Sequence, residues 1–265
     1  MAVSDFIYDN IYLSEFNSGK YVMGYFSADE QPTQGDMNIN QVSLFGGKEQ
    51  PFVYTNYEST LTFTIGIIKN PCVTSETDIS IAEMENLKRW LCRPAPHIFK
   101  LNDSDYNGIY WEGTFKVEEQ IVGNKRVGVI LSFISTRPYA LQDDVVYTGT
   151  VAANGKVTIN DVSKEIGYIY PDITLTVLTD GNLTIYNDFD QRQTIIKNCE
   201  ADEVIIFSKY QQISTDSATH DLFNDFNYKF IRIGNNYATT ENKLSFSLSC
   251  RYVITYNPIR KVLPI

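Results

Sequence analysis

One stretch of this sequence constrains the fold more than any other: residues 109–134 alternate apolar and polar side chains through two successive runs. A period of two places neighbouring side chains on opposite faces of a β-strand. The runs are separated by Val122–Lys125, whose central Gly-Asn pair suits a tight turn. The stretch therefore predicts a long antiparallel hairpin with one apolar face, made by Trp111, Gly113, Phe115, Val117, Val127, Val129, Leu131 and Phe133.

Further strands are expected on both sides of this hairpin. Leu61–Ile68 places four apolar residues on one face, which is typical of a strand with one side buried. Tyr8–Leu13, Tyr21–Phe26 and Asn38–Leu44 show weaker alternation. The chain has 18 Tyr and 15 Phe in 265 residues, and aromatic residues fit pleated, half-buried surfaces. The fold class expected is mainly β.

A single helix interrupts the strands. Ser80 and Glu83 have the spacing of a capping box, in which each side chain binds a free backbone donor of the first turn. The prolines of Arg93–Pro96 end the helix, because proline cannot continue it. We expect a helix from Ser80 to Leu91 that packs on a sheet through Ile81, Met84, Leu87 and Leu91. Trp90 flanks this stripe, as a core residue or, alternatively, as a binding aromatic.

A polar connector near 138–145 divides the chain into expected domains of 1–140 and 141–265. The second domain shows short alternating strands between Asn/Gly/Asp turns, such as Ala153–Lys156, and no convincing helix. Regular short strands with such turns predict a β-sandwich. Residues 211–227 are polar and are expected to form a long exposed loop.

The charge balance excludes one large class of partners. The chain has 22 Lys and Arg against 32 Asp and Glu, a formal net charge of −10. Gripping nucleic acid requires clustered cations that displace counterions, and anionic membranes attract the same clusters. Neither nucleic-acid nor membrane binding is expected. No run approaches the roughly 20 apolar residues of a membrane span, and Met1–Asn10 lacks the pattern of a signal peptide, so we expect synthesis and folding in the cytoplasm.

The sequence offers little catalytic chemistry. Its two histidines, His97 and His220, are expected at the surface or in loops, and its four separated cysteines as buried thiols without disulfides. Asp103–Gly108 matches the first half of a calcium-binding loop, but Thr114 stands where a bidentate carboxylate is required. A polar hairpin turn is the favoured interpretation, with adventitious calcium as the alternative. No cofactor, metal site or enzymatic activity is expected, although acidic pairs such as Asp143/Asp144 leave an unrecognised hydrolase open.

The order of several short motifs resembles the distal tail protein (Dit) family of long-tailed, non-contractile bacteriophages, the siphophages. The resemblance covers the whole chain. It is carried by the helix end Lys88–Leu91, the turn that starts at Leu101, the strand residues Tyr110–Gly113, the boundary Phe133–Ala140, and in the second half Pro171–Ile173, Leu183–Asn187 and Gly234–Tyr237.

This resemblance implies a tail-tube-like N-terminal domain, a β-barrel or sheet with one helix, and a galectin-like C-terminal β-sandwich. Six copies would form a ring in the virion that joins the tail tube protein to the tail-tip protein, with DNA passing through the lumen. Receptor-binding proteins are further expected partners. The acidic composition suits a duct for a polyanion. A carbohydrate-binding module and another tail component, such as a tube protein, are the alternatives.

The ring interface is expected in the first domain. The long hairpin has a second face that carries Gly128, Ile130 and Ile134, which a monomer with one solvated face does not require. These residues are assigned to contacts between subunits or, alternatively, to contacts with the helix Ser80–Leu91. Residues 1–140 alone are expected to oligomerise, and residues 141–265 alone to remain monomeric.

Overall fold

The hairpin that dominates the sequence is the spine of the first part of the molecule. In a computed structural model that describes residues 5–24, 32–42 and 52–262, β8 (Ile109–Val122) pairs with β9 (Lys125–Ser135) in antiparallel register. Gly123 and Asn124 have φ angles of 55° and 68°. Two successive positive φ angles define the turn that matches the twist of a hairpin. The predicted hairpin and its turn are confirmed.

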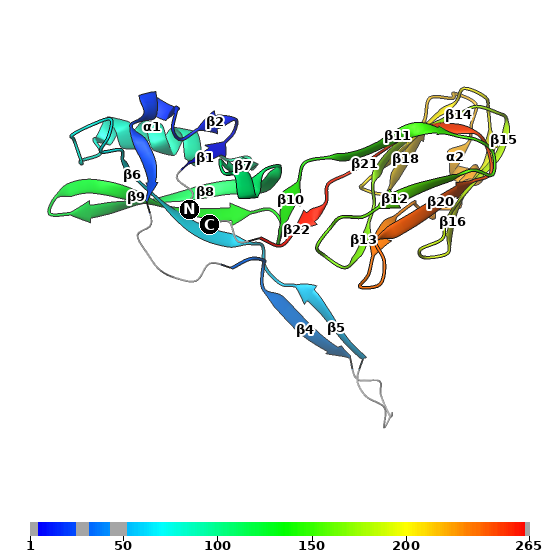
Figure 1. Cartoon of the computed structure of the whole chain (residues 1–265), viewed down its shortest axis with the longest axis horizontal. Coiled ribbons are helices and arrows are strands. Elements are labelled where there is room, and N and C mark those ends of the chain that lie inside the picture. Colours follow the sequence, from blue (N-terminus) through cyan, green and yellow to red (C-terminus); the bar gives the residue numbers. More distant parts are fainter. Residues whose placement is uncertain (1–4, 25–31, 43–51, 263–265) are drawn as a thin grey trace. The chain divides into compact units, whose positions relative to one another are not determined.

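The hairpin lies within a nine-stranded sheet, visible in Figure 1 around β8 and β9. The strand order is β2-β1-β7-β8-β9-β6-β3, with β10 paired to β8 and β22 paired to β10. The other bounds are β1 Phe6–Tyr8, β2 Ile11–Tyr12, β3 Tyr21–Gly24, β6 Thr62–Lys69, β7 His97–Leu101, β10 Ala140–Gln142 and β22 Ile259–Arg260.

The expected strands of this region are present, with one correction to the fold class. The strand at Leu61–Ile68 is β6, Tyr21–Phe26 contains β3, and Asn38–Leu44 overlaps β4 (Met37–Val42), which pairs separately with β5 (Phe52–Tyr57), a strand that was not expected. Tyr8–Leu13 is not one strand: it starts at the last residue of β1 and contains β2, with a turn at Asp9 and Asn10 between them. Residues 25, 26, 43 and 44 of those candidates lie outside the described residues. The sheet is not a closed barrel, because within the described residues β2 and β3 are its two ends and do not pair with each other.

Helix α1 (Ile81–Leu91) covers the apolar face of this sheet. Both hydrogen bonds of the predicted capping box are present, since Glu83 N donates to Ser80 Oγ and Ser80 N donates to Glu83 Oε2. Trp90 is a core residue, stacked on Phe6 with ring centroids 5.7 Å apart. Ile81 was wrongly placed on the packed stripe: it is 63% exposed.

The residue before the helix cap explains this error. Ile79 is fully buried, and Met84 is almost fully buried. An apolar residue just before the cap commonly packs against the fourth helical residue. Ile79 thus occupies the core position that the periodicity assigns to Ile81, and the buried face of the helix consists of Met84, Leu87, Trp90 and Leu91.

The second part of the molecule is a two-sheet sandwich around its own core, as predicted. One sheet has the order β11-β21-β14-β17-β18 and the other β12-β20-β15-β16, with β13 and β19 forming a separate pair. The bounds are β11 Val145–Val151, β12 Lys156–Asn160, β13 Gly167–Ile169, β14 Asp172–Val177, β15 Gly181–Asn187, β16 Arg192–Cys199, β17 Val204–Ser208, β18 Gln212–Thr215, β19 Ile233–Asn235, β20 Glu241–Phe246 and β21 Cys250–Tyr256.

The chain forms two compact units, and it passes between them twice. One unit comprises residues 1–142 with 260–265, and the other comprises residues 143–259. The expected division assigned everything after residue 140 to the second domain, whereas residues 260–262, the last that the structure describes, belong to the first unit. Arg260 Nε donates to Gln142 Oε1 at 2.8 Å, which joins the two ends of that unit.

Candidate functional site

The three residues assigned to the ring interface lie on one strand and one face. Gly128, Ile130 and Ile134 all belong to β9, and each is paired on both sides. Ile130 lies between Gly66 of β6 and Glu118 of β8. Gly128 is buried, Ile130 is half-buried and Ile134 is 45% exposed. Alternation places them opposite the core-facing residues of β9.

The helix does not cover this face, so one of the two explanations offered for it is wrong. Trp90 of α1 belongs to the same core cluster as Leu131 and Phe133, which alternate with Ile130 and Ile134. Helix α1 therefore packs on the opposite side of β9. Contact between subunits is the explanation that stays a prediction.

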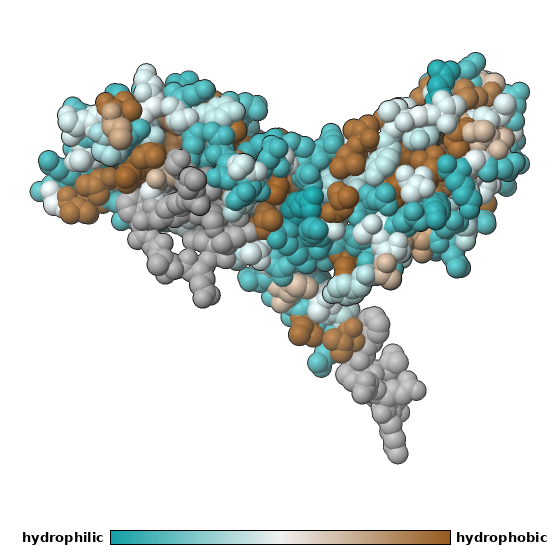
Figure 2. Space-filling view, viewed as in Figure 1, coloured by the Kyte–Doolittle hydropathy of each residue, from teal (hydrophilic) through white to brown (hydrophobic). Residues whose placement is uncertain are grey.

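A second apolar surface was not recognised in the sequence. Among the described residues, β4 and β5 pair only with each other. Both faces of this hairpin carry exposed apolar or aromatic side chains: Met37, Ile39 and Val53 on one face, and Val42 and Tyr54 on the other. In Figure 2 brown atoms are visible on the hairpin in the face that the view shows. An isolated two-stranded hairpin is marginal in water. The detectable signal was the presence of apolar residues at both odd and even positions.

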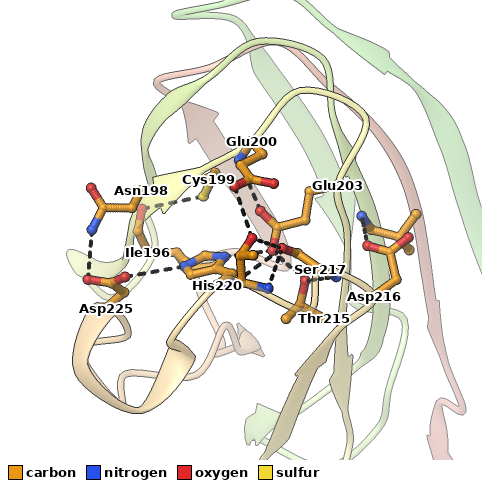
Figure 3. Close-up of polar contacts among 12 residues, drawn as sticks. Ile196, Asn198, Cys199, Glu200, Glu203, Thr215, Asp216, Ser217, His220 and Asp225 are labelled. Atoms are coloured by element: carbon orange, nitrogen blue, oxygen red, sulfur yellow. Dashed lines mark hydrogen bonds and ion pairs between the residues drawn. The ribbon is translucent and has the colours of Figure 1, made fainter.

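A polar cluster surrounds His220 in the second unit (Figure 3). The segment 211–227 is not the open loop that was expected, since it contains β18 and the short helix α2 (Leu222–Asp225). His220 is not at the surface: its side chain is fully buried. Its Nδ1 lies 2.6 Å from Glu203 Oε1, and its Nε2 lies 3.7 Å from Asp225 Oδ2.

Hydrogen bonds around this ring tie the segment to the sandwich. The hydroxyl of Thr215 also donates to Glu203 Oε1, and Glu200 N donates to Glu203 Oε2 at 3.0 Å. Asn198 Nδ2 donates to Asp225 Oδ1 at 3.0 Å. A buried carboxylate requires such partners, because an unpaired charge in the interior is costly.

This cluster does not have the geometry of a nucleophilic site. Catalysis by a Ser-His or Cys-His pair needs the nucleophile at one imidazole nitrogen and an orienting acid at the other. Both nitrogens of His220 face carboxylates. The nearby Cys199 thiol is buried, and burial raises its pKa to about 11, so it is not a reactive thiolate near neutral pH. The arrangement is a structural clamp.

The remaining candidates are local features. Asp103–Gly108 connects the paired strands β7 and β8 as a polar turn, in which Asp103 Oδ1 accepts from Asp105 N at 2.9 Å. His97 lies on β7, with Nδ1 3.0 Å from Asp9 Oδ1. Within the described ranges, no group of three or more His, Cys, Asp or Glu residues could hold a metal ion.

The cysteine prediction was half wrong. Cys199 and Cys250 are buried as expected, whereas Cys72 and Cys92 are exposed. The exposed pair lies in a turn and at the helix end, where the local sequence carries no alternation that would indicate burial. All four are free thiols. In the part of the chain that is described, no helix is long and apolar enough to cross a membrane.

Comparisons with known proteins cover almost the whole chain. A family model described as the phage tail protein N-terminal domain matches residues 1–137, and one described as the phage tail C-terminal domain matches residues 139–256. No curated protein matches.

Two solved structures align with this chain over nearly their whole length. The crystal structure of SPP1 Dit (gp 19.1), described as a paradigm of the hub adsorption apparatus in phages that infect Gram-positive bacteria, matches with a TM-score of 0.65 at 11% identity, over 97% of this chain and 99% of that chain. A chain of the phage P2 baseplate in its activated conformation with Ca matches with a TM-score of 0.39 at 12% identity, over 96% and 98%. The first score indicates a common fold, whereas the second is too low to do so.

Proposed function

This chain belongs to the phage tail protein family, and we propose that in the tail it is the distal tail protein, a hub ring that joins the tail tube to the tail-tip machinery. It has the fold of SPP1 Dit, the hub protein of a siphophage, as the sequence motifs indicated. Its place is therefore the virion, and we further propose that it is assembled in the host cytoplasm. Its role is to hold other proteins, not to catalyse a reaction.

The observation that carries the ring proposal is the pair of apolar surfaces on the first unit. Ile39 on β4 is 65% exposed and Val53 on β5 is 50% exposed, while Ile134 on β9 is 45% exposed. Apolar side chains gathered on sheet faces and on an isolated hairpin mark protein contacts. In a heterologous interface, one patch of a subunit contacts a different patch of the next subunit. Such an interface generates a ring when the rotation between successive subunits adds up to a full turn.

We assign ring formation to residues 1–140, completed by the returning C-terminal residues, and we propose six copies. In such a ring the lumen passes DNA without binding it specifically, which the net charge of −10 supports because like charges repel. The neighbours are the tail tube protein on one side and the tail-tip protein on the other. Residues 141–265, taken as a galectin-like sandwich, form an outer platform for receptor-binding proteins.

The full-length protein tests this proposal. Light scattering and negative-stain imaging should show rings of about six times the 30.2 kDa subunit, either alone or after addition of the neighbouring tail protein. Ile134→Lys and Ile130→Lys should shift the protein toward the monomer without unfolding it. A matched control is Val253→Lys, on an outward sheet face of the second unit and 42% exposed, which should leave the ring intact.

A strict monomer in both conditions would contradict the ring. Intact rings in both β9 variants would contradict the assigned surface while leaving the ring itself standing. The two outcomes are distinguished by the wild-type sample.

A further inference from the structure

The first unit contains a cleft that the proposed hub function does not use. It lies between helix α1 and the segment 11–17, which includes β2, and the two elements lie close together in Figure 1. Its volume is about 320 Å³, and pockets that bind small ligands or short peptide segments begin at about 300 Å³. The cleft is lined by Ile11, Phe16, Asn17, Asn86, Arg89, Trp90 and Arg93. We call it the α1 cleft.

The apolar wall of the α1 cleft is a rigid aromatic stack. Phe16 stacks on Trp90 with ring centroids 4.4 Å apart, and Trp90 stacks in turn on Phe6 at 5.7 Å. The Trp90 indole Nε1 donates to Tyr8 O at 3.1 Å, so the ring cannot turn without losing a buried hydrogen bond. Ile11, which is 37% exposed, extends the apolar surface. An apolar group that enters the cleft therefore meets a preformed surface, which reduces the entropic cost of binding.

The backbone beside this stack is held in an unusual conformation. Residues 17–19 have successive φ angles of 51°, 64° and 72°, all in the left-handed region. Residues with side chains rarely adopt this conformation, and it persists where surrounding contacts impose it, often at binding sites. The Phe16 stack holds one end of the segment, and a hydrogen bond from Asn70 N to Lys20 O, at 2.8 Å, holds the other. The position of Asn17 in the cleft is thereby fixed.

Two arginines supply the charge of the cleft. Arg93 is partly engaged, because its Nε donates to Trp90 O at 2.9 Å and its Nη2 donates to Asp9 Oδ2 at 3.2 Å. Arg89 is exposed and forms no ion pair within the described ranges. A guanidinium group carries only hydrogen-bond donors, and a carboxylate is an acceptor that matches its planar fork. The cleft therefore favours a ligand that carries a carboxylate.

The acidic residues of the two flanking segments leave this preference in place. Most of the other charged side chains of residues 5–20 and 80–93 are already paired or hydrogen-bonded within the fold: Asp5, Asp9, Lys20, Glu83 and Lys88. Glu15 and Glu85 are exposed, and neither lines the cleft. Glu85 lies one helical turn before Arg89, so it weakens the attraction of Arg89 for an anion without blocking the cleft.

The length of the cleft fits a short extended peptide. Its α1 side extends from Asn86 to Arg93, which at 1.5 Å per residue spans about 10 Å. An extended chain rises about 3.3 Å per residue, so about three residues fit along this side. The amides of Asn17 and Asn86 can both donate to and accept from the backbone of such a peptide.

We propose that the α1 cleft binds an extended peptide segment of another protein chain, in which an acidic residue stands beside an apolar or aromatic one. The apolar side chain rests on Phe16 and Ile11, and the carboxylate binds Arg89 and the free part of the Arg93 guanidinium. This activity goes beyond the proposed hub function. It does not depend on ring formation, because all the residues of the cleft belong to one unit of one chain.

The full-length protein carries its own reporter for the test. Trp90 lines the cleft, whereas Trp111, the second of the two tryptophans, does not. The probe is acetyl-Leu-Glu-Phe-amide, which should change the tryptophan emission in a saturable way. Acetyl-Leu-Gln-Phe-amide lacks the carboxylate and acetyl-Ala-Glu-Ala-amide lacks the apolar side chains, and each should bind roughly 10-fold more weakly.

Three variants of the protein test the assignment of the charges. Arg89→Gln should lower the affinity for acetyl-Leu-Glu-Phe-amide roughly 10-fold, as expected for the loss of a hydrogen bond between charged groups, and should keep the wild-type urea midpoint. Glu85→Gln removes the neighbouring acid and should raise the affinity about 2-fold. Arg251→Gln makes the same charge change at an exposed position of the second unit, and it should leave the affinity unchanged.

Several results would overturn the inference. These are no saturable change with acetyl-Leu-Glu-Phe-amide, equal binding of its Gln analogue, or wild-type affinity in Arg89→Gln. Phenylacetate that binds as tightly as the peptide would identify a small-molecule site instead, and tighter binding of acetyl-Leu-Phe with a free carboxylate would identify a site for a chain terminus. Light scattering on the same samples reports ring formation separately, so failure of the cleft and failure of the hub proposal are distinguishable.

Discussion

The ion pair between Lys69 and Glu83 should contribute more to the first unit than an ordinary surface pair. Lys69 Nζ lies 3.0 Å from Glu83 Oε2, and the two side chains are only 3% and 15% exposed. Glu83 also closes the capping box of α1. Glu83→Gln keeps an oxygen for the cap but leaves the Lys69 ammonium buried with Glu76, whose side chain is 78% exposed.

The structure allows the size of the effect to be worked out. Removing one partner of a buried ion pair costs about 3–5 kcal/mol, because the other charge is left uncompensated in the interior. Glu76 remains 3.3 Å from Lys69 Nζ and offsets part of this. We therefore expect Glu83→Gln to lower the free energy of unfolding by about 2–3 kcal/mol at pH 7.

The effect should depend on pH in a known direction. Burial of Glu83 opposes ionisation, but hydrogen bonds from Ser80 N and Lys69 outweigh it and hold the pKa of the carboxyl below its ordinary value of 4.5. A carboxyl with a lowered folded pKa stabilises the protein above its unfolded pKa, and this is lost as the pH falls through the folded pKa. The difference between wild type and Glu83→Gln should shrink below pH 4.5.

The assay is urea unfolding followed by tryptophan fluorescence. The chain has two Trp, and both Trp90 and Trp111 are in the core of the first unit, so the signal reports that unit alone. Lys69→Met combined with Glu83→Gln should recover much of the loss, and Glu85→Gln, on the exposed face of α1, is the control. A variant within about 0.5 kcal/mol of wild type at pH 7, or a difference unchanged in acid, would refute the reasoning.

Three further predictions concern packing and accessibility. Gly113→Ala should destabilise the first unit by about 1–3 kcal/mol, because its new Cβ would lie 2.2 Å from a carbonyl oxygen of β9. Gly24→Ala should cost less, because its Cβ would meet the side chain of Ile68 at 3.4 Å, and equal unfolding midpoints for the two variants would contradict this. Removal of residues 260–265 should lower the urea midpoint of the first unit, as followed by tryptophan fluorescence, because Arg260 donates a hydrogen bond to Gln142 of that unit. An unchanged urea midpoint would contradict this. Thiol titration at pH 8 should modify the exposed Cys72 and Cys92 in the native protein and all four cysteines after unfolding. Cys199 and Cys250 should be protected, because burial raises the pKa of their thiols to about 11 and about 12. Rapid labelling of all four thiols in the native protein would contradict this.

Local sequence patterns were sufficient where the structure is itself local. The hairpin 109–134 needed only alternation and a Gly-Asn turn, and the cap of α1 needed only Ser80 and Glu83 at the right spacing. These features are set by backbone geometry within a few residues. The order of the motifs along the chain indicated the family, although no single motif was specific.

Burial of single polar side chains depended on long-range contacts and was not visible in the sequence. His220 lies among Asp, Ser and Thr residues that are typical of a loop. Its ring is nevertheless buried, and its Nδ1 is hydrogen-bonded to Glu203, 17 residues earlier in the sequence. The exposure of Phe223 is the reverse case, an apolar residue that the sandwich leaves outside. Neither follows from periodicity, because periodicity describes one element and not what packs against it.

The sequence by itself determined the strand-rich class, the long hairpin, the helix cap and the acidic charge, since each depends on residue type or on spacing within one element. Only the tertiary structure decided that the sheet stays open within the described residues, that α1 covers the face opposite Ile130, and that residues 260–262 rejoin the first unit. The physical reason is that these outcomes are choices among pairings of distant segments. Gln142 and Arg260 are 118 positions apart in the sequence. They meet because β22 pairs with β10 after the chain has completed the second unit, which no local pattern indicates.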